Sequence, residues 1–331
     1  MRKYCKPMRI KIFTEAGQNV GLGHLQRCIC LFREISLCAI ETVLVIRGDF
    51  NGAVLPDDVH FENVDWISIK YLSGIISNTN LCIFDSYMIH QSIIDYLSTE
   101  KIRTIFLDDD ARVVYRNGFV VNPGIGAQFI NYRASDELIF LTGPDYVIIR
   151  PQFLALRRES MRTEVRNVLI TTGGSNQNDL LTSIIGTLCE KYNDISFCIV
   201  VAGGISANLK ENSPKNVTFF VDISAEAMAK LMLSSDFAIS AAGQTIYELI
   251  VTKTPFIAIQ IAQNQKYNIM GMKAKNKYQE IINALNDDFA QCILVSFEKM
   301  LKLDKRIHSS LGYGDSIDGL GCVRIVNAII R

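Results

Sequence analysis

A histidine stands directly behind two glycines, at the start of an expected helix. The segment reads Gly21-Leu22-Gly23-His24-Leu25-Gln26-Arg27-Cys28 and comes after the apolar run Ile10–Phe13. Gly21 and Gly23 allow a tight turn and leave the first amides of the helix available to an anion. The positive end of the helix disfavours the imidazolium form, which suits His24 to act as a general base. The alternative is a histidine that caps the helix or packs under the loop, and the pattern alone does not decide between them.

Two turns rich in small residues follow expected strands in the second half of the chain. They are Ile170-Thr171-Thr172-Gly173-Gly174-Ser175-Asn176 and Ser240-Ala241-Ala242-Gly243-Gln244-Thr245-Ile246-Tyr247-Glu248. Small residues let a phosphate approach the backbone, and the unpaired N–H groups of the next helix can bind a diphosphate. Glu248, one turn into its helix, is placed to accept both hydroxyls of a ribose. The alternatives are an ordinary capped turn at the first segment and a capping box, Thr245-x-x-Glu248, at the second.

Polar residues follow two other expected strands. Gln263-Asn264-Gln265 comes shortly after Phe256–Ile259, and Asp85-Ser86-Tyr87 comes after Leu81–Phe84. Ligands of open α/β sheets bind at the carboxyl ends of the strands, so these side chains are candidates for lining a ligand site. They are equally compatible with ordinary polar loops.

Neither a metal nor a redox cofactor is expected. Gln26 stands where the dinucleotide-binding pattern G-x-G-x-x-G has its last glycine. Asp108, Asp109 and Asp110 follow the run Thr104–Leu107, but three adjacent carboxylates cannot all face one ion. No second acidic motif lies near them in the sequence.

Short β-branched runs alternate with longer amphipathic stretches along the chain. In the first half, the expected strands are Ile10–Phe13, Val43–Ile46, Leu81–Phe84 and Thr104–Leu107, and the expected helices are Leu25–Cys38 and Gln91–Thr99. In the second half, the expected strands are Val168–Thr171, Phe197–Val201, Val217–Val221, Phe237–Ser240 and Phe256–Ile259, and the expected helices are Asp179–Lys191, Ala225–Leu233, Thr245–Val251 and Gln265–Asn276. The strands lack clean apolar–polar alternation, which is typical of parallel strands covered on both faces.

This alternation predicts an α/β protein with two Rossmann-like domains that face a central cleft. We expect the domains to span residues 1–150 and 151–331, with the boundary at Pro151 and a linking helix over Arg157–Arg166. The amphipathic segment Gly321–Arg331 is compatible with packing on either domain.

Composition limits the class of protein and of partner. A chain of 331 residues fits two domains, and its hydrophobic share of 49% and charged share of 21% are those of globular proteins. Lys plus Arg and Asp plus Glu both number 34, so a nucleic-acid partner held mainly by charge is not expected. The nine cysteines show neither zinc nor C-x-x-C spacing. No apolar core of a signal peptide and no run of about 20 apolar residues is present, so we expect a soluble cytoplasmic protein without membrane insertion.

Taken together, these residues resemble the UDP-sugar hydrolase of the pseudaminic acid pathway and the related spore-coat polysaccharide proteins. That family removes UDP from UDP-2,4-diacetamido-2,4,6-trideoxy-β-L-altrose. The resemblance covers nearly the whole chain, and the order and spacing of its motifs are more specific than any single motif. The motifs are Gly21-x-Gly23-His24-x-x-Arg27-Cys28, Asp85-x-Tyr87, Leu107-Asp108-Asp109, Gly173-Gly174-Ser175, Ala242-Gly243-x-Thr245-x-x-Glu248, Asn264-Gln265 and Asp318-Gly-Leu-Gly-x-x-Arg324.

The resemblance implies the GT-B fold and a set of site residues. The histidine that matches His24 is the catalytic residue of the family. The tyrosine and asparagine that match Tyr87 and Asn264 help to place the sugar and the attacking water. The substrate-binding positions that we expect are Gly21, Gly23, Arg27, Gly173, Gly174, Ser175, Ala242, Gly243, Thr245, Glu248 and Gln265.

The resemblance implies hydrolysis of a UDP-sugar with inversion, with His24 as the base for a water. Thr14–Val20 departs from the pseudaminic enzymes, because it has Glu-Ala-Gly where they more often have an Arg-x-Asp start. This departure leaves the exact sugar open. The alternatives are a glycosyltransferase of the same fold, a sugar-nucleotide 2-epimerase and a non-catalytic UDP-sugar-binding protein.

Overall fold

The chain forms two compact units in a computed structural model, which describes residues 8–17, 23–48, 55–133, 135–173, 177–285 and 288–330. Met1–Ile148 and Leu320–Arg331 make up the first unit, and Ile149–Gly319 makes up the second. Gly21, Gly174 and Ser175 lie outside the described residues. None of the helices described is long and apolar enough to cross a membrane.

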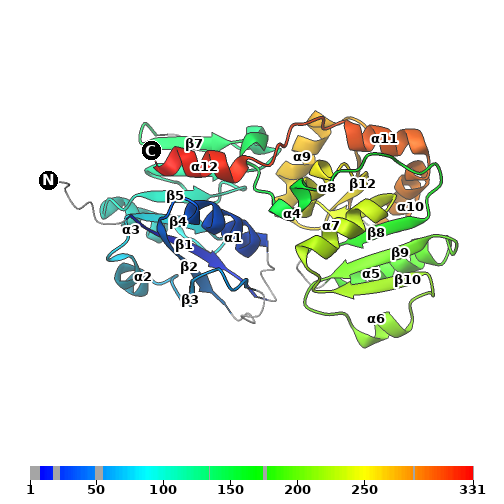
Figure 1. The fold of residues 1–331 in the computed structure, drawn as a ribbon, viewed down its shortest axis with the longest axis horizontal. Coiled ribbons are helices and arrows are strands. Elements are labelled where there is room, and N and C mark those ends of the chain that lie inside the picture. Colours follow the sequence, from blue (N-terminus) through cyan, green and yellow to red (C-terminus); the bar gives the residue numbers. More distant parts are fainter. Residues whose placement is uncertain are drawn as a thin grey trace. The chain divides into compact units, whose positions relative to one another are not determined.

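The first unit contains a parallel sheet of seven strands in the order β3-β2-β1-β4-β5-β6-β7 (Figure 1). The strands are β1 (Arg9–Glu15), β2 (Glu41–Arg47), β3 (Phe61–Asn63), β4 (Leu81–Asp85), β5 (Thr104–Leu107), β6 (Gly118–Asn122) and β7 (Leu138–Thr142). The helices are α1 (Gly23–Ser36), α2 (Ile69–Ile76), α3 (Gln91–Thr99) and α12 (Gly321–Ile330), with 3₁₀ turns at Ala127–Phe129 and Pro144–Tyr146.

Both faces of this sheet are buried. Ile10 and Ile12 of β1 pack into a core shared with α1 and α12, whereas Phe13 points to the other face and shares a core with α2 and α3. The Phe13 ring stacks on Phe84 of β4, with centroids 4.7 Å apart. Apolar side chains on both faces explain why the strands read as continuous apolar runs.

The second unit contains a parallel sheet of six strands in the order β10-β9-β8-β11-β12-β13. The strands are β8 (Asn167–Thr171), β9 (Ser196–Val201), β10 (Val217–Val221), β11 (Phe237–Ala241), β12 (Phe256–Gln260) and β13 (Glu280–Asn283). The helices are α4 (Pro151–Leu154), α5 (Asn178–Ile184), α6 (Ala207–Glu211), α7 (Ala225–Ser234), α8 (Thr245–Val251), α9 (Lys266–Lys275), α10 (Phe289–Met300) and α11 (Leu303–Leu311), with a π-helical turn at Ile185–Cys189 and a 3₁₀ turn at Gln263–Gln265. The predicted pair of parallel α/β sheets is therefore confirmed.

Helix α12 belongs to the first unit, although the expected second domain, 151–331, included it. Ile325 and Ile329 are fully buried in the core that α1 and β1 share, and α12 lies beside α1 on one face of the sheet (Figure 1). Gly321 permits this packing, since a Cβ there would lie 2.1 Å from the carbonyl oxygen of Val147. The chain therefore returns to the first unit after it completes the second.

The expected linking helix over Arg157–Arg166 is wrong. The structure has only the short helix α4, and the segment after it has no helical turn. The buried Arg306 donates to the carbonyl oxygens of Arg162 and Thr163 at 2.9 and 2.7 Å. Arg158 in turn donates to the carbonyl oxygen of Met232 at 2.8 Å. Within the second unit, the bonds from Arg306 satisfy the carbonyl oxygens of Arg162 and Thr163 in place of the internal bonds of a helix.

Candidate active site

Three neighbouring strands of the first unit end beside one another. Strand β1 lies between β2 and β4, and β4 lies between β1 and β5. The strand order reverses at β1, which makes the carboxyl ends of β1 and β4 the switch point of this sheet. Glu15, Asp85 and Leu107 are the last residues of β1, β4 and β5, and α1 begins after β1 at Gly23.

His24 lies in the first turn of α1 and is held by a buried carboxylate. Its Nδ1 lies 2.6 Å from Oδ1 of Asp85, whose side chain is fully buried. Burial opposes ionisation of Asp85, but the charge of Arg27 and the hydrogen bonds from His24 and Arg27 outweigh it and hold the pKa of Asp85 below its usual value. A terminal nitrogen of Arg27 also lies 3.0 Å from Nδ1, but this nitrogen donates to Asp85 Oδ1 at 2.6 Å. Because a carboxylate only accepts hydrogen bonds, the shorter contact of Nδ1, with Asp85, places the hydrogen on Nδ1. A neutral His24 then has its lone pair on Nε2, which is the form of a general base.

Arg27, one turn further along α1, clamps the same carboxylate. Its Nε and one terminal nitrogen lie 2.9 and 2.6 Å from the two oxygens of Asp85. Its other terminal nitrogen lies 3.4 Å from Oδ2 of Asp109. Burial lowers the pKa of Arg27, but Asp85 and Asp109 more than compensate and raise it well above its usual value. The guanidinium thus neutralises Asp85 and fixes the carboxylate that orients His24.

Tyr87 packs against the imidazole. The two rings meet edge to face with centroids 4.4 Å apart, and the Tyr87 hydroxyl donates to Oδ1 of Asp109 at 2.9 Å. The backbone N–H of Tyr87 donates to Oε1 of Glu15 at 2.7 Å. Glu15 is 1% exposed, and burial raises its pKa. The structure therefore brings His24, Arg27 and Tyr87 together around Asp85 and Asp109.

The aspartates that follow β5 have separate partners. Asp108 turns back to accept the backbone N–H groups of Asp110 and Ala111 at 2.9 and 3.0 Å, and burial raises its pKa. Asp109 instead faces Tyr87 and Arg27. Among the residues that the structure describes, no group of three or more His, Cys, Asp or Glu side chains is arranged to hold a metal ion.

In the second unit, the glycine-rich turns follow the adjacent strands β8 and β11. Gly173 has φ +87°, a left-handed conformation that favours glycine, and among the described residues no heavy atom outside its chain neighbours lies within 4 Å of where its Cβ would be. Ala242 is fully buried and donates its N–H to the carbonyl oxygen of Ile259 at 2.8 Å. The backbone at Gly173 is thus open to close approach, as a phosphate-binding turn requires.

Glu248 does not form the capping box that was considered for it. Helix α8 begins at Thr245, and its N-cap residue, Gln244, makes no side-chain capping bond. The Glu248 side chain is 3% exposed and accepts from Nε of Arg150 at 2.7 Å. A residue far away in the sequence thus fixes the carboxylate expected to bind ribose.

The segment after β12 contacts the turn after β11. Gln265 accepts the N–H of Ile261 at 2.8 Å, and a Cβ on Gly243 would lie 3.9 Å from its Nε2. Asn268 of α9 donates to the carbonyl oxygen of Ala242 at 2.9 Å. Asn264 lies in the same 3₁₀ turn as Gln265. The expected residues Gly243 and Gln265 are therefore neighbours.

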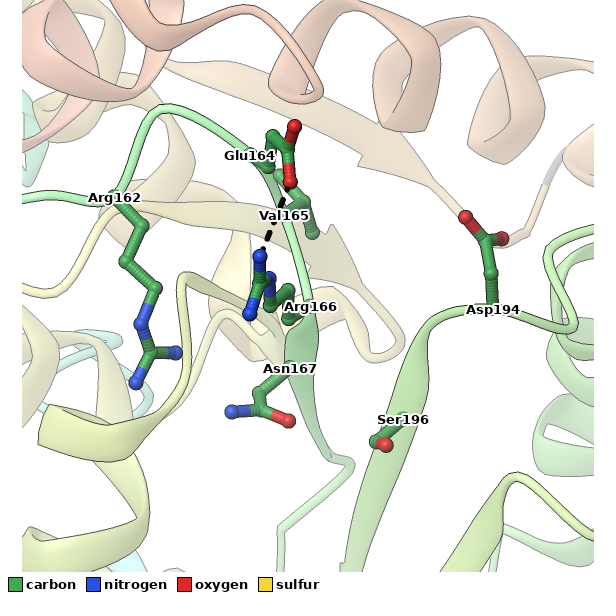
Figure 2. Close-up of a pocket in the computed structure, with 7 residues that line it drawn as sticks. All are labelled: Arg162, Glu164, Val165, Arg166, Asn167, Asp194 and Ser196. Atoms are coloured by element: carbon green, nitrogen blue, oxygen red, sulfur yellow. Dashed lines mark hydrogen bonds and ion pairs between the residues drawn. The ribbon is translucent and has the colours of Figure 1, made fainter.

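A cavity of about 670 Å³ lies at the amino ends of strands β8 and β9 of the second sheet (Figure 2). Its lining residues precede β8 and β9 or begin these strands, and carry two positive and two negative charges. They are Arg162, Glu164, Val165, Arg166, Asn167, Asp194 and Ser196. Gly173, in contrast, follows the carboxyl end of β8, where ligands of such sheets bind. This cavity is therefore separate from the expected nucleotide site.

Comparison with known proteins gives two informative relatives, whereas no protein-family model matches the sequence. The chain is 26% identical over 95% of its length to the pseudaminic acid cytidylyltransferase and UDP-2,4-diacetamido-2,4,6-trideoxy-β-L-altropyranose hydrolase of Helicobacter pylori. It spans about half of that protein, 55%. It is 22% identical to the spore coat polysaccharide biosynthesis protein SpsG of Bacillus subtilis, over 78% of the chain and 79% of SpsG.

Solved structures show the same fold at low sequence identity. Acinetobacter baumannii MurG has a TM-score of 0.65 and 14% identity over 98% of this chain and 99% of its own. Staphylococcus aureus MnaA, solved with UDP, has a TM-score of 0.67 and 10% identity over 97% of this chain and 96% of its own. The fold is therefore GT-B, as MurG has it. Over most of its length the chain is therefore similar to a protein whose name includes the pseudaminic acid pathway hydrolase and to a spore-coat polysaccharide protein.

Proposed function

We propose that the protein hydrolyses a UDP-sugar to UDP and the free sugar, with inversion at the anomeric carbon. The observation that carries the proposal is the 2.6 Å contact between Nδ1 of His24 and the buried Asp85, which leaves Nε2 as a base. The name of the Helicobacter relative, which includes a UDP-sugar hydrolase, supports this reaction class. The substrate that we propose is UDP-2,4-diacetamido-2,4,6-trideoxy-β-L-altrose or a close relative, in surface polysaccharide or nonulosonic acid biosynthesis.

The reaction is a single displacement in which His24 Nε2 removes one proton from a water. The oxygen of that water forms a bond to the anomeric carbon while the bond from this carbon to the phosphate oxygen breaks. The electron pair of the broken bond leaves with UDP. Attack from the face opposite the leaving group inverts the configuration, as in other single-displacement glycoside hydrolyses. Asp85 stabilises the imidazolium that forms, and Tyr87 helps to place the water.

The second unit supplies the residues that we propose for binding UDP. Gly173, with Gly174 and Ser175, lets the backbone approach the diphosphate, and Ala242 and Gly243 do the same after β11. Glu248, held by Arg150, accepts the ribose hydroxyls. Because UDP is a good leaving group, binding its growing charge replaces a general acid, and the reaction that we propose uses neither metal nor cofactor.

The experiment follows UDP and free sugar by NMR, with purified protein and the proposed substrate but without metal or acceptor. We expect UDP release to be lost in His24→Ala and kept in His60→Ala, a matched change at an exposed histidine. General-base removal lowers kcat by about 10²–10⁴-fold. Release that appears only with an added sugar acceptor would identify a glycosyltransferase, and binding without any turnover would identify a non-catalytic protein.

A further inference from the structure

The Tyr87 hydroxyl has a single hydrogen, which it donates to Asp109. The hydroxyl oxygen lies 2.9 Å from Oδ1 of Asp109. A carboxylate has acceptor atoms only, so the hydroxyl is the donor in this bond. In any further hydrogen bond the Tyr87 oxygen must therefore be an acceptor.

The loop after β5 is built around this tyrosine. Asp108 accepts the backbone N–H of Ala111 at 3.0 Å, and Ala111 has a left-handed φ of 53°. This turn brings Arg112 over the Tyr87 ring, with its guanidinium carbon 4.4 Å from the centroid, and Arg112 donates to the carbonyl oxygen of Tyr87. The loop thus holds the hydroxyl, the ring and the backbone of one residue.

The second oxygen of Asp109 closes a ring of contacts. Oδ2 lies 3.4 Å from Arg27, and Arg27 clamps Asp85, which holds His24. The Tyr87 ring completes the circle through its edge-to-face contact with His24. A change at Asp109 can therefore reach the imidazole by two routes, through Tyr87 or through Arg27.

We propose that Asp109 is a positioning residue that turns the Tyr87 hydroxyl hydrogen away from the reacting water. Tyr87 Oη and His24 Nε2 then each accept one hydrogen of that water. A water that donates both hydrogens presents a lone pair to the anomeric carbon. The water hydrogen that is bonded to His24 Nε2 is transferred to it during attack. The water hydrogen that is bonded to Tyr87 Oη stays on the oxygen, which becomes the new sugar hydroxyl. This inference rests on the proposed hydrolysis, and Asp109 itself does not contact the substrate.

The kinetic test uses Asp109→Asn, which replaces an acceptor-only group with one that can donate to Tyr87. We expect kcat to fall about tenfold or more with KM changed less than about twofold, because orientation is lost rather than binding. Asp109→Glu keeps the carboxylate and should retain more activity. Asp136→Asn, the same charge change at an exposed site of the first unit, should have no effect.

A double-mutant cycle separates the two routes. In a Tyr87→Phe background, Asp109→Asn should lower kcat by less than about twofold more, since its target hydroxyl is gone. A further loss as large as that in wild type would mean that Asp109 acts through Arg27, and would overturn the inference.

A spectroscopic test does not depend on turnover. In protein with ¹³Cζ-labelled tyrosine, the signal missing from Tyr87→Phe should shift in Asp109→Asn and stay in place in Asp136→Asn. An unshifted signal in folded Asp109→Asn protein would show that the hydroxyl does not donate to Asp109, and would overturn the inference. A shifted signal in a protein that hydrolyses no UDP-sugar would support the hydroxyl orientation and refute the reaction.

Discussion

Replacement of Asp85 by asparagine leaves three nitrogen donors facing a group with a single acceptor oxygen. The carboxylate is fully buried and lies 2.6 Å from Nδ1 of His24 and 2.9 and 2.6 Å from two nitrogens of Arg27. An asparagine whose amide nitrogen replaces Oδ1 faces both Nδ1 of His24 and a terminal nitrogen of Arg27, and it requires the other tautomer of His24, with its hydrogen on Nε2. An asparagine in the opposite orientation points its N–H at the Arg27 guanidinium.

We expect the substitution to lower both kcat and the free energy of unfolding. The wrong tautomer removes the base, so kcat should fall about 10²–10⁴-fold. Removing one partner of a buried ion pair costs about 3–5 kcal/mol. Because Arg27 keeps Asp109 at 3.4 Å and the asparagine oxygen still accepts one bond, we expect the lower end of this range in the free energy of unfolding, about 3 kcal/mol.

The assay measures kcat for UDP release and the free energy of unfolding in urea for Asp85→Asn and a surface control. The control is Asp58→Asn, which breaks an exposed pair with Arg33 and should cost about 0–1 kcal/mol with kcat unchanged. In a His24→Ala background, Asp85→Asn should lower kcat by less than about threefold more. A folded Asp85→Asn protein with kcat within about threefold of wild type would refute the role assigned to Asp85.

Three further predictions concern other parts of the chain. Glu15→Gln should raise the free energy of unfolding more at pH 8 than at pH 5. Burial raises the pKa of Glu15 in the folded protein, so its protonation stabilises the fold at low pH, and this stabilisation is lost as pH rises. Equal gains at both pH values would contradict this. Glu248→Gln should weaken UDP binding by about tenfold, measured by calorimetry, and unchanged affinity would exclude a ribose contact. Ile325→Ala should destabilise the first unit by about 2–5 kcal/mol in urea unfolding, and a smaller loss would contradict the packing of α12.

Most of the strands that the sequence predicted have side chains buried on both faces, but β10 was predicted without a buried residue and β6 was missed although Val120 and Val121 are buried. Strand β4 is buried at all five positions and stands out as an apolar run. Strand β3 was missed because its three residues are all exposed at the sheet edge. The position of α12 depends on contacts with α1, which its amphipathic pattern does not specify.

The candidate site was predictable only in part for a similar reason. His24 and Tyr87 were predicted from motif and resemblance, but the roles that we propose for Asp85 and Asp109 depend on which strands are neighbours. The order β1-β4-β5 brings together carboxylates that are 58 and 82 residues from Arg27 in the sequence. Likewise, Arg150 is 98 residues from Glu248, and no local pattern predicts their ion pair.

The most direct test of the central claim is hydrolysis of the proposed UDP-sugar in H₂¹⁸O, without an acceptor, followed by NMR and mass spectrometry. If water attacks the anomeric carbon with His24 as its base, ¹⁸O will appear in the C1 hydroxyl of the sugar, the first anomer formed will be inverted, and His24→Ala will form almost none. Label in UDP would mean that a phosphorus–oxygen bond breaks instead, and it would contradict the account.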